Sequence, residues 1–211
     1  GTYLAVKKTV GGETAERLLA GICPALISAL SFPKRMRWGD GEFTFARPLR
    51  WIVSLLDDKV VPFTVGTVAA GNASRGHRVH GAPNIVIPRA DQYFEIMERE
   101  SGVCLCAEKR KRTIVEKGNR LAASVKGVVI WKESLLDEVV GLVEHPHAIL
   151  GNIDEKFLEL PREVMLTSME VHQKSFGVEG RDGKLLPYFL TVLNISPKDE
   201  DMVRVGWERV L

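Results

Sequence analysis

Apolar residues recur every three or four positions in several stretches of the chain, the spacing that places side chains on one face of a helix. The clearest of these stretches predicts a helix over Ala107–Lys126. Another spans residues 13–30, where Pro24 should produce a kink or divide the stretch into two short helices. The remaining helices are expected from Pro88 to about Glu100, over Ser134–Val143, from Pro161 onward and from Pro197 to the end.

Short runs rich in β-branched and aromatic residues separate these helical stretches and predict strands. Two pairs of runs are joined by turn residues and indicate hairpins: Leu49–Leu56 with Val60–Val65, and Phe176–Val178 with Leu185–Leu193. Single strands are expected at Asn84–Ile87, Val103–Cys106 and Val128–Trp131.

Hairpins mixed with helices, without the regular strand–helix–strand rhythm of a parallel sheet, predict an α+β fold. We expect mixed, largely antiparallel sheets with packed helices, in a single domain that spans residues 1–211. Residues 1–30 would form a helical lead-in, and residues 198–211 the start of the next helical segment. The chain begins without an initiator methionine and stops inside a helical pattern, so we interpret it as a fragment of a longer chain.

Charge is unevenly distributed along the chain, although it nearly cancels over all 211 residues. Residues 1–126 carry 20 Lys or Arg and 12 Asp or Glu, whereas residues 127–211 carry 9 and 15. No acidic residue lies between Asp58 and Asp91, in a stretch whose glycines would let backbone amides approach an anion. A loop that simply lacks carboxylates explains this stretch equally well. The basic half is therefore the half that a polyanion would approach.

Composition narrows the class of protein. The hydrophobic fraction of 45% and the net charge of +2 exclude a disordered chain, and no window approaches the ~18 apolar residues of a membrane span. Three cysteines without the spacing of a disulfide framework indicate a reducing compartment, and no signal peptide opens the chain. We therefore expect a cytoplasmic protein that does not enter a membrane.

The histidines and cysteines do not predict a metal site. Zinc needs three or four convergent ligands, whereas Cys104 and Cys106 alternate on an expected strand and so point to opposite faces. The chain also lacks a Gly-x-Ser-x-Gly nucleophile turn, a Walker loop and a dinucleotide-binding glycine motif. We therefore expect no metal, no bound cofactor and no catalytic residue in this chain.

One basic segment, Phe32–Gly39, interleaves three cations with two aromatic rings. Lys34, Arg35 and Arg37 can hold phosphate by charge, while Trp38 offers a flat face to a base or ribose. Alternatively, the two rings pin this loop onto the core. On the first interpretation these four residues are candidate nucleic-acid contacts.

Two further segments supply candidates. One lies in the acid-free stretch, and the other follows an expected helix end, where its side chains would hydrogen-bond a sugar-phosphate or only cap the helix. The run of four cations at Lys109–Arg112 lies on a helix, where it would be a solvated face. The candidates are Arg75, His77 and Arg78 in the first segment, and His172, Gln173 and Lys174 in the second.

Several short motifs, in order along the chain, resemble those of the bacterial glycyl-tRNA synthetase β subunit. Each motif alone is weak, but together they are specific and cover essentially the whole chain. They are Phe32–Gly39, Arg47–Trp51, Gly71–Arg78, Leu142–Pro146, Thr167–Lys174 and Gly183–Phe189.

This resemblance implies a function and partners. In that family an α2β2 enzyme attaches glycine to tRNA: the α subunit holds the site for glycine, ATP and Mg, and the β subunit binds and positions tRNA(Gly). The chain would be the amino-terminal portion of the longer β subunit, a tRNA-engaging and non-adenylating part of a glycine–tRNA ligase. This portion is similar, more distantly, to the B3/B4 region of the phenylalanyl-tRNA synthetase β subunit, which implies a B3/B4-like fold.

Two other functions stay open. The chain could be an editing-like hydrolase of mischarged tRNA, with His77, His145 or His172 as the base, because the B3/B4 region of phenylalanyl-tRNA synthetase performs editing. It could instead be a purely structural module that holds the subunits together. A deacylation assay would test the first alternative, and salt-dependent tRNA binding would test the second.

Overall fold

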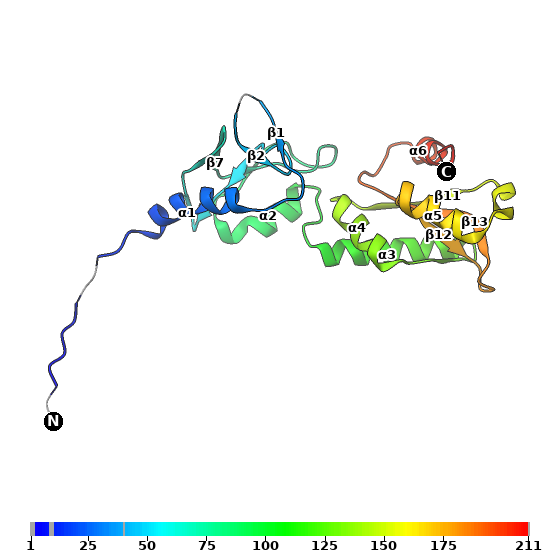
Figure 1. Cartoon of the computed structure of the whole chain (residues 1–211), viewed down its shortest axis with the longest axis horizontal. Helices are drawn as coiled ribbons and strands as arrows, with labels where there is room; N and C mark the ends of the chain where they lie inside the picture. The colour runs from blue at the N-terminus through cyan, green and yellow to red at the C-terminus, as the bar shows by residue number, and fades with distance from the viewer. Residues whose placement is uncertain (1–2, 9–10, 40, 211) are drawn as a thin grey trace. The chain divides into compact units, whose positions relative to one another are not determined.

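The computed structural model describes residues 3–8, 11–39 and 41–210, which form two compact units (Figure 1). Unit 1 comprises Gly1–Arg75 and Asn84–Ile96, and unit 2 comprises Gly76–Pro83 and Met97–Leu211. Both units combine helices with mainly antiparallel strands, which confirms the α+β class. The single domain expected over the whole chain stays a prediction, because compactness does not measure whether two units unfold together.

The first helix of unit 1 is α1 (Ala15–Ala29), which starts at Thr14, whose hydroxyl accepts a hydrogen bond from the Arg17 amide. Pro24 lies inside α1 without dividing it into two helices, since the helix is continuous from Ala15 to Ala29. The Ser28 hydroxyl donates back to the Pro24 carbonyl at 2.8 Å. The apolar stripe of this helix is largely exposed, at Leu18, Ile22, Leu26 and Leu30.

Short paired strands make up most of unit 1. In its three-stranded sheet, β7 (Val68–Gly71) pairs in parallel with β3 (Ile52–Val53) and antiparallel with β6 (Thr64–Val65). The first expected hairpin is present as β4 (Leu55–Leu56) with β5 (Lys59–Val60). The other antiparallel pairs are β1 (Met36–Arg37) with β2 (Thr44–Phe45), and β8 (Ala73–Ser74) with β9 (Ile85–Val86).

The helix expected near Pro88 begins slightly later than predicted. A single 3₁₀ turn, η1 (Ala90–Gln92), leads into α2 (Tyr93–Glu100). The Ala90 amide donates to the Asp57 carbonyl at 2.7 Å, so η1 is tied to the turn of the β4–β5 hairpin. The fully buried apolar side chains of this unit are small, and they are Val61, Ile85 and Ile87.

A four-stranded antiparallel sheet is the centre of unit 2. Its order is β10 (Val128–Val129), β12 (Phe176–Glu179), β13 (Leu185–Leu193) and β11 (His147–Asn152). The second expected hairpin is therefore confirmed as the neighbours β12 and β13. The long strand β13 occupies the middle of the sheet and pairs with β11 along six residues.

Helices α3 (Ala107–Ser124) and α4 (Glu133–Leu142) pack with this sheet around one apolar core. The approach of α3 is close, since a Cβ at Gly118 would lie 2.7 Å from the Leu190 side chain and 2.8 Å from the Trp131 ring. Buried residues of this core include Ile114, Leu136, Val140, Phe176, Val178 and Leu190.

The rest of unit 2 consists of four shorter elements and one irregular segment that the sequence predicted as a strand. The strand expected at Val103–Cys106 is wrong, because the segment is irregular and pairs with no strand in the described chain. The Arg110 guanidinium instead donates hydrogen bonds to the carbonyls of Cys104 and Leu105, at 2.6 and 3.1 Å. The shorter elements are η2 (Glu155–Glu159), α5 (Arg162–Thr167), the π-helical turn η3 (Ser168–His172) and α6 (Glu200–Glu208).

Within unit 2, residues 76–83 run close beside residues 100–102. The His77 amide donates to the Ser101 carbonyl at 2.6 Å, and the Gly81 amide donates to the His77 carbonyl at 2.8 Å. A Cβ at Gly81 would overlap the Ser101 carbonyl oxygen, and Gly102 has a φ of +64°. The glycines of this crossing therefore allow two backbone segments to touch. In the described parts of the chain, no helix has the length and apolarity needed to cross a membrane.

Candidate nucleic-acid interface

The basic segment predicted to meet nucleic acid forms the β1–β2 hairpin of unit 1. Its rings pack on each other: Phe32 lies edge-on to Phe45 at 4.7 Å between centroids, and Trp38 lies edge-on to Phe43 at 5.9 Å. Trp38 is only partly exposed. The aromatic residues of this loop therefore support the alternative interpretation, in which they pin the hairpin.

The three cations of the same hairpin differ in their surroundings. Arg35 donates to the carbonyls of Ser28 and Leu30, at 3.3 and 3.1 Å, and so caps the last turn of α1. Lys34 and Arg37 are exposed and have no carboxylate partner among the described residues of unit 1. Two of the three cations are thus available to an anion, and the third serves the fold.

Arg75 has a different neighbour, which sequence reasoning missed. Its guanidinium carbon lies 5.8 Å from the ring centroid of Trp51, a cation–π contact, and Trp51 is 40% exposed. Arg75 has no carboxylate partner among the described residues of unit 1. The only signal for Trp51 in the sequence was its place in the motif Arg47–Trp51, read there as part of a strand. The Arg75–Trp51 pair is the exposed cation–aromatic contact of unit 1.

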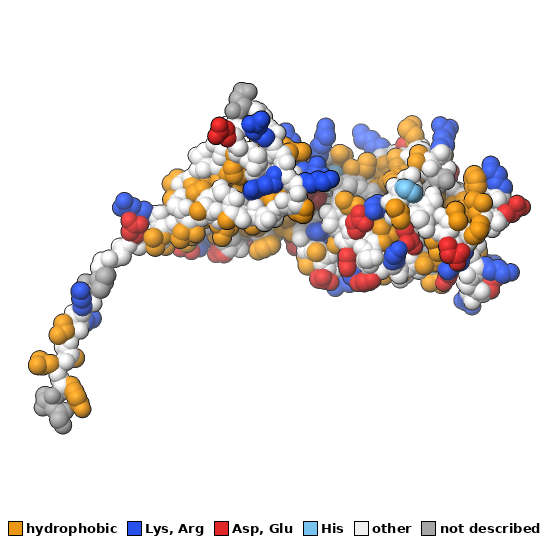
Figure 2. Space-filling view, in the orientation of Figure 1, with side chains coloured by type: hydrophobic (Ala, Val, Ile, Leu, Met, Phe, Trp, Pro, Cys, Tyr) orange, Lys and Arg blue, Asp and Glu red, His pale blue; other side chains and the backbone are white. Residues whose placement is uncertain are grey.

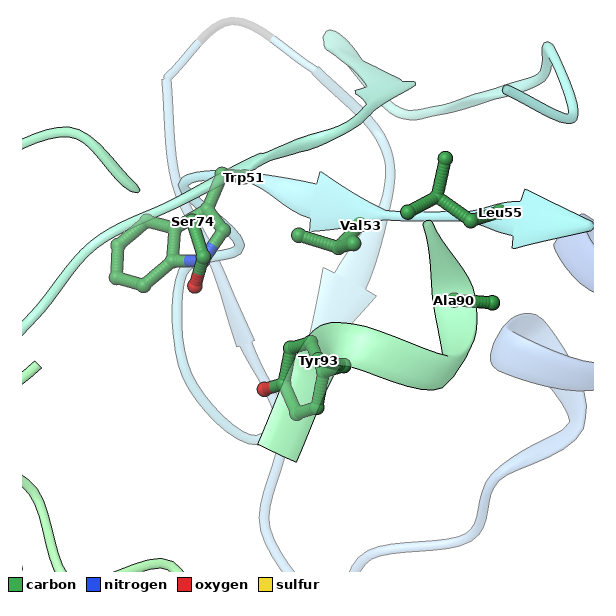
Figure 3. Close-up of a pocket in the computed structure, with 6 residues that line it drawn as sticks. All are labelled: Trp51, Val53, Leu55, Ser74, Ala90 and Tyr93. Atoms are coloured by element: carbon green, nitrogen blue, oxygen red, sulfur yellow. The ribbon is translucent and has the colours of Figure 1, made fainter. Parts of the chain in front are cut away.

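A cavity of about 400 Å³ lies beside this pair in unit 1 (Figure 3). One wall follows the chain of β3 and β4, and Tyr93 stands on another side at the start of α2. Charged side chains are absent from the described residues that line it. The lining residues are Trp51, Val53, Leu55, Ser74, Ala90 and Tyr93.

His77 and Arg78 lie in unit 2, on the glycine-containing segment 76–83. His77 is 5% exposed, and its Nδ1 accepts the amides of Val79 and His80, each at 3.2 Å. The amides of this segment are therefore engaged with protein atoms and do not form a phosphate cradle. Arg78 is exposed and has no carboxylate partner among the described residues of unit 2.

The imidazoles of His77, His80 and His145 in unit 2 form a histidine cluster, which no sequence motif predicted. The ring centroids of His77 and His80 are 5.2 Å apart, and that of His145 lies 4.3 Å from His80 and 5.5 Å from His77. Burial first, and then the neighbouring imidazoles, lower the pKa of His80 below its ordinary value of 6.5. Nε2 of His80 accepts the Ser196 amide at 2.9 Å, a contact in which this nitrogen carries no proton.

Ser196 lies between two histidines of this region. Its hydroxyl is 3.0 Å from Nε2 of His145 and 3.3 Å from Nδ1 of His147. Because Nδ1 of His145 donates to the Gly102 carbonyl at 2.9 Å, Nε2 of the neutral ring is free to accept the Ser196 proton. Nε2 of His147 lies 2.7 Å from the Glu200 carboxylate. The Glu200 carboxylate, the His147 imidazole, the Ser196 hydroxyl and the His145 imidazole thus form a chain of polar contacts in this order.

The last predicted segment follows η3 in unit 2. Lys174 adopts a φ of 52° and forms an ion pair with Glu138 at 2.9 Å, so its charge is already balanced. His172 is exposed, and with Gln173 and Lys174 it borders a cavity of about 460 Å³ that Trp207 also lines. These three residues are brought together, but the structure places no free cation among them.

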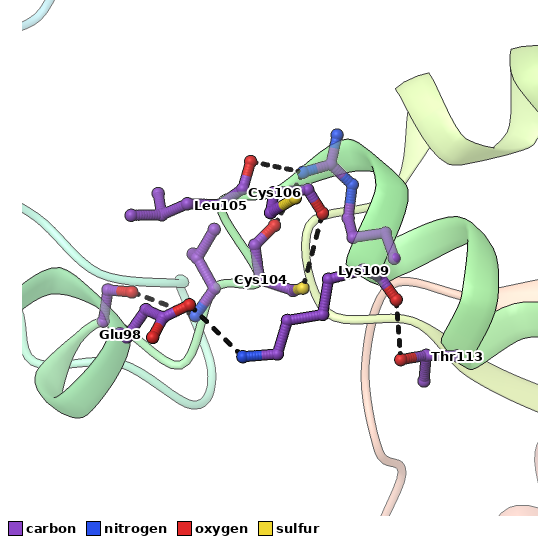
Figure 4. A network of polar contacts seen from close by, with 9 residues as sticks. Glu98, Cys104, Leu105, Cys106, Lys109 and Thr113 are labelled. Carbon is purple, nitrogen blue, oxygen red and sulfur yellow. Dashed lines mark hydrogen bonds and ion pairs between the residues drawn. The ribbon is translucent and has the colours of Figure 1, made fainter. Parts of the chain in front are cut away.

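The run Lys109–Arg112 is largely committed to contacts within unit 2. Lys109 pairs with Glu98 at 3.2 Å (Figure 4), and Lys111 contacts the carboxylates of Glu133 and Asp137. These two carboxylates raise the pKa of Lys111 above its ordinary value. In Figure 2 the visible face of unit 2 shows Lys and Arg interspersed with Asp and Glu. Opposite charges therefore compensate one another on that face.

Metal ligands do not converge in the parts of the chain that the structure describes. No three His, Cys, Asp or Glu side chains there are placed to hold one ion. In the histidine cluster the rings of His80 and His145 stack on one another, and Nδ1 of His77, Nε2 of His80 and both nitrogens of His145 hydrogen-bond to protein atoms.

Comparison with known proteins assigns a family to the whole chain. The sequence profile described as glycyl-tRNA synthetase beta subunit matches residues 1–211. The glycine–tRNA ligase beta subunit of Nitratidesulfovibrio vulgaris strain Hildenborough is 58% identical over all 211 residues, and that of Lawsonia intracellularis is 48% identical. The corresponding subunit of Syntrophus aciditrophicus is 40% identical over the same length. The chain spans 30% of the length of each of these relatives.

Proposed function

The chain belongs to the glycyl-tRNA synthetase beta subunit family, and from this premise we propose that it is the part of a glycine–tRNA ligase that engages tRNA(Gly) without forming the adenylate. The observation that carries this proposal is the Arg75–Trp51 contact, in which a cation without a carboxylate partner in the described part of its unit lies on an exposed ring. In the proposed assembly, glycine, ATP and Mg bind to a partner α subunit in an α2β2 enzyme. Synthesis of glycyl-tRNA is then a cytoplasmic activity of the complete enzyme.

The physical argument concerns which cations are free. An unpaired Lys or Arg displaces the counterions that surround a phosphate, whereas a phosphate must compete with a carboxylate for a paired Lys or Arg. Lys34, Arg37 and Arg75 in unit 1 are unpaired in the described chain, while Lys109 and Lys111 in unit 2 are paired. We therefore place the RNA contact on unit 1 and add Arg78 of unit 2 as a further free cation.

A partner subunit also needs a surface. The exposed apolar stripe of α1 includes Ile22 and Leu26, which are 53% and 61% exposed. Such a stripe is typical of a helix that is covered in a larger assembly. We propose that α1 packs against the remainder of the synthetase, and that the RNA-binding residues lie elsewhere in unit 1.

Titration of the holoenzyme with tRNA(Gly) at several salt concentrations tests the proposal. Each lost phosphate contact makes the negative slope of log affinity against log salt less steep by about 0.7 to 0.9. The variants Arg37→Gln and Arg75→Gln should each make this slope less steep, and Lys109→Gln should leave it unchanged. Equal slopes in all three variants and the parent enzyme would show that unit 1 does not contact the phosphates.

A second candidate function, an editing-like hydrolase of mischarged tRNA, is favoured by the Ser196 network. Ser196 would attack the ester carbonyl while its proton moves to Nε2 of His145, held in the required tautomer by the Gly102 carbonyl. The proton would then pass to the departing ribose oxygen, and water would release the amino acid from Ser196. Of the bases considered from the sequence, His145 has this geometry, whereas both ring contacts of His77 serve the fold.

Deacylation by the holoenzyme separates this candidate from simple RNA binding. With tRNA(Gly) mischarged with alanine, Ser196→Ala should abolish hydrolysis if Ser196 is the nucleophile. Ser124→Ala is the matched control, because the Ser124 hydroxyl only donates to the Leu121 carbonyl on α3. If the parent enzyme and both variants deacylate no faster than buffer, the Ser196 network is structural.

A further inference from the structure

The cavity of unit 1 has walls of two kinds. Trp51, Val53 and Leu55 occupy alternate positions along the extended stretch that contains β3 and β4, so their side chains lie on the same face of this stretch. Tyr93, from the first turn of α2, supplies a second ring on another side (Figure 3). The site therefore presents two aromatic surfaces with an aliphatic surface between them.

Charge is confined to the rim of this cavity. The Arg75 guanidinium lies 5.8 Å from the Trp51 centroid and has no carboxylate partner among the described residues of unit 1. On the other side, Asp57 lies two residues beyond Leu55, and Asp91 follows Ala90 and pairs with Arg89 at 3.2 Å. The Arg75 side of the rim therefore favours an anionic group, and the interior favours a flat uncharged one.

These two demands describe a nucleotide. A free amino acid would need a carboxylate and an ammonium partner together, and the described lining offers neither. A volume of about 400 Å³ exceeds that of one planar base and lies in the range of small-ligand pockets. Stacking on aromatic rings with a cation at the phosphate is the usual way in which proteins hold single-stranded RNA.

We propose that this cavity binds one unpaired nucleotide of tRNA, with its base on Trp51 and Tyr93 and its phosphate at Arg75. The inference rests on the proposed function, tRNA binding by unit 1, and adds a base-binding site that the predicted interface did not contain. Helical RNA does not fit, because the bases of a duplex are stacked on one another and cannot enter.

The test compares ring removal with ring retention in the holoenzyme. Trp51→Leu should weaken tRNA(Gly) binding by roughly 5- to 150-fold, the equivalent of ~1–3 kcal/mol per stacked base. Trp51→Phe should restore most of this loss, and neither change should alter the salt slope, since no phosphate contact is removed. Phe157→Leu is the matched control, because Phe157 of unit 2 is a 37% exposed ring whose centroid lies 4.9 Å from Nζ of Lys156, and it does not line the cavity.

A second measurement uses RNA alone as the probe. A single-stranded oligonucleotide should compete with tRNA(Gly), and an abasic oligomer of the same length should compete much less with the parent enzyme. For Trp51→Leu the two competitors should become alike.

Failure of this inference differs from failure of the proposed function. If Arg75→Gln weakens tRNA binding but Trp51→Leu does not, unit 1 binds phosphate and the base site is wrong. If neither variant changes tRNA binding, both proposals are wrong. If Trp51→Leu lowers only the melting temperature or the assembly of the subunits, the cavity is filled by protein and the base site is wrong.

Discussion

Two sets of cations in this chain look alike in the sequence and differ in the structure. Lys34, Arg37 and Arg75 of unit 1 have no carboxylate partner in the described part of their unit, and Arg75 lies on an exposed indole ring. In unit 2, Lys109 and Lys111 reach carboxylates from neighbouring helices. Local charge density therefore does not identify a binding surface, because the tertiary fold decides which charges are already compensated.

The two units also differ in the size of the side chains that they bury completely. Unit 2 buries Phe176 completely, with the Trp131 ring edge-on at 4.7 Å, whereas the fully buried side chains described in unit 1 are Val and Ile. The described part of unit 1 also carries the exposed Trp51 ring and the unpaired Arg75 on which the proposed RNA contact rests.

The largest expected effect concerns these cores. Phe176→Ala should cost about 3–5 kcal/mol of unfolding free energy, and Ile87→Val of unit 1 about 0.5–1.5 kcal/mol. Urea unfolding of the chain measures both. If each variant shifts one shared transition, the single domain expected from the sequence is supported, whereas two transitions that shift separately would show that the units unfold independently.

The next prediction concerns the cations themselves. Arg75→Gln should weaken tRNA(Gly) binding with a reduced salt slope and leave the melting temperature nearly unchanged, because it breaks no ion pair. Lys111→Gln should do the reverse, since Glu133 and Asp137 lose their partner. Filter binding and thermal melting of the two variants measure both effects. Weaker tRNA binding by Lys111→Gln, with unchanged binding by Arg75→Gln, would contradict the comparison.

A smaller effect is expected from pH, and it concerns unit 2. The pKa of folded His80 is below 6.5, whereas the unfolded residue titrates near 6.5. The unfolded state therefore binds more protons, and stability should fall as the pH drops through 6.5 and below. His80→Gln should flatten this dependence between pH 7.5 and 5.5 in urea titrations, while His172→Gln, which lies outside the cluster, should leave it intact. Identical pH profiles for all three proteins would refute the assignment.

The smallest expected effect is the response to metal removal. Nδ1 of His77, Nε2 of His80 and both ring nitrogens of His145 are already hydrogen-bonded to protein atoms. A chelator should therefore leave the melting curve unchanged, and elemental analysis should find no stoichiometric zinc. One zinc per chain, lost together with the fold on chelation, would overturn the expectation.

Local sequence patterns predicted the elements with strong periodicity. Ala107–Lys126 was expected as a helix and α3 ends two residues earlier, and the strand expected at Leu185–Leu193 is β13 itself. Val103–Cys106 has the same β-rich composition, but a strand also needs a neighbour, and Arg110 occupies its carbonyls instead. In the sheet of unit 2, a local pattern predicted only the neighbours β12 and β13, because the pairings with β10 and β11 join distant segments.

The candidate site was predicted by residue type more than by arrangement. Sequence reasoning selected Arg75 as a candidate nucleic-acid contact, which stays a prediction, but could not place Trp51 beside it, since 24 positions separate them. It also grouped Arg35 with its neighbours, although Arg35 caps α1. Side chains of the same type differ in role only through the neighbours that the fold places next to them.

The crossing of residues 76–83 with residues 100–102 has a consequence for evolution. At Gly81 a Cβ would overlap the Ser101 carbonyl, and Gly76 is similarly crowded by the same residue. In a library of all single substitutions, these two positions should therefore tolerate almost no replacement, whatever the enzyme is selected to do. Sequence constancy at these glycines across organisms would then record steric exclusion, and it could not be used as evidence that they bind RNA.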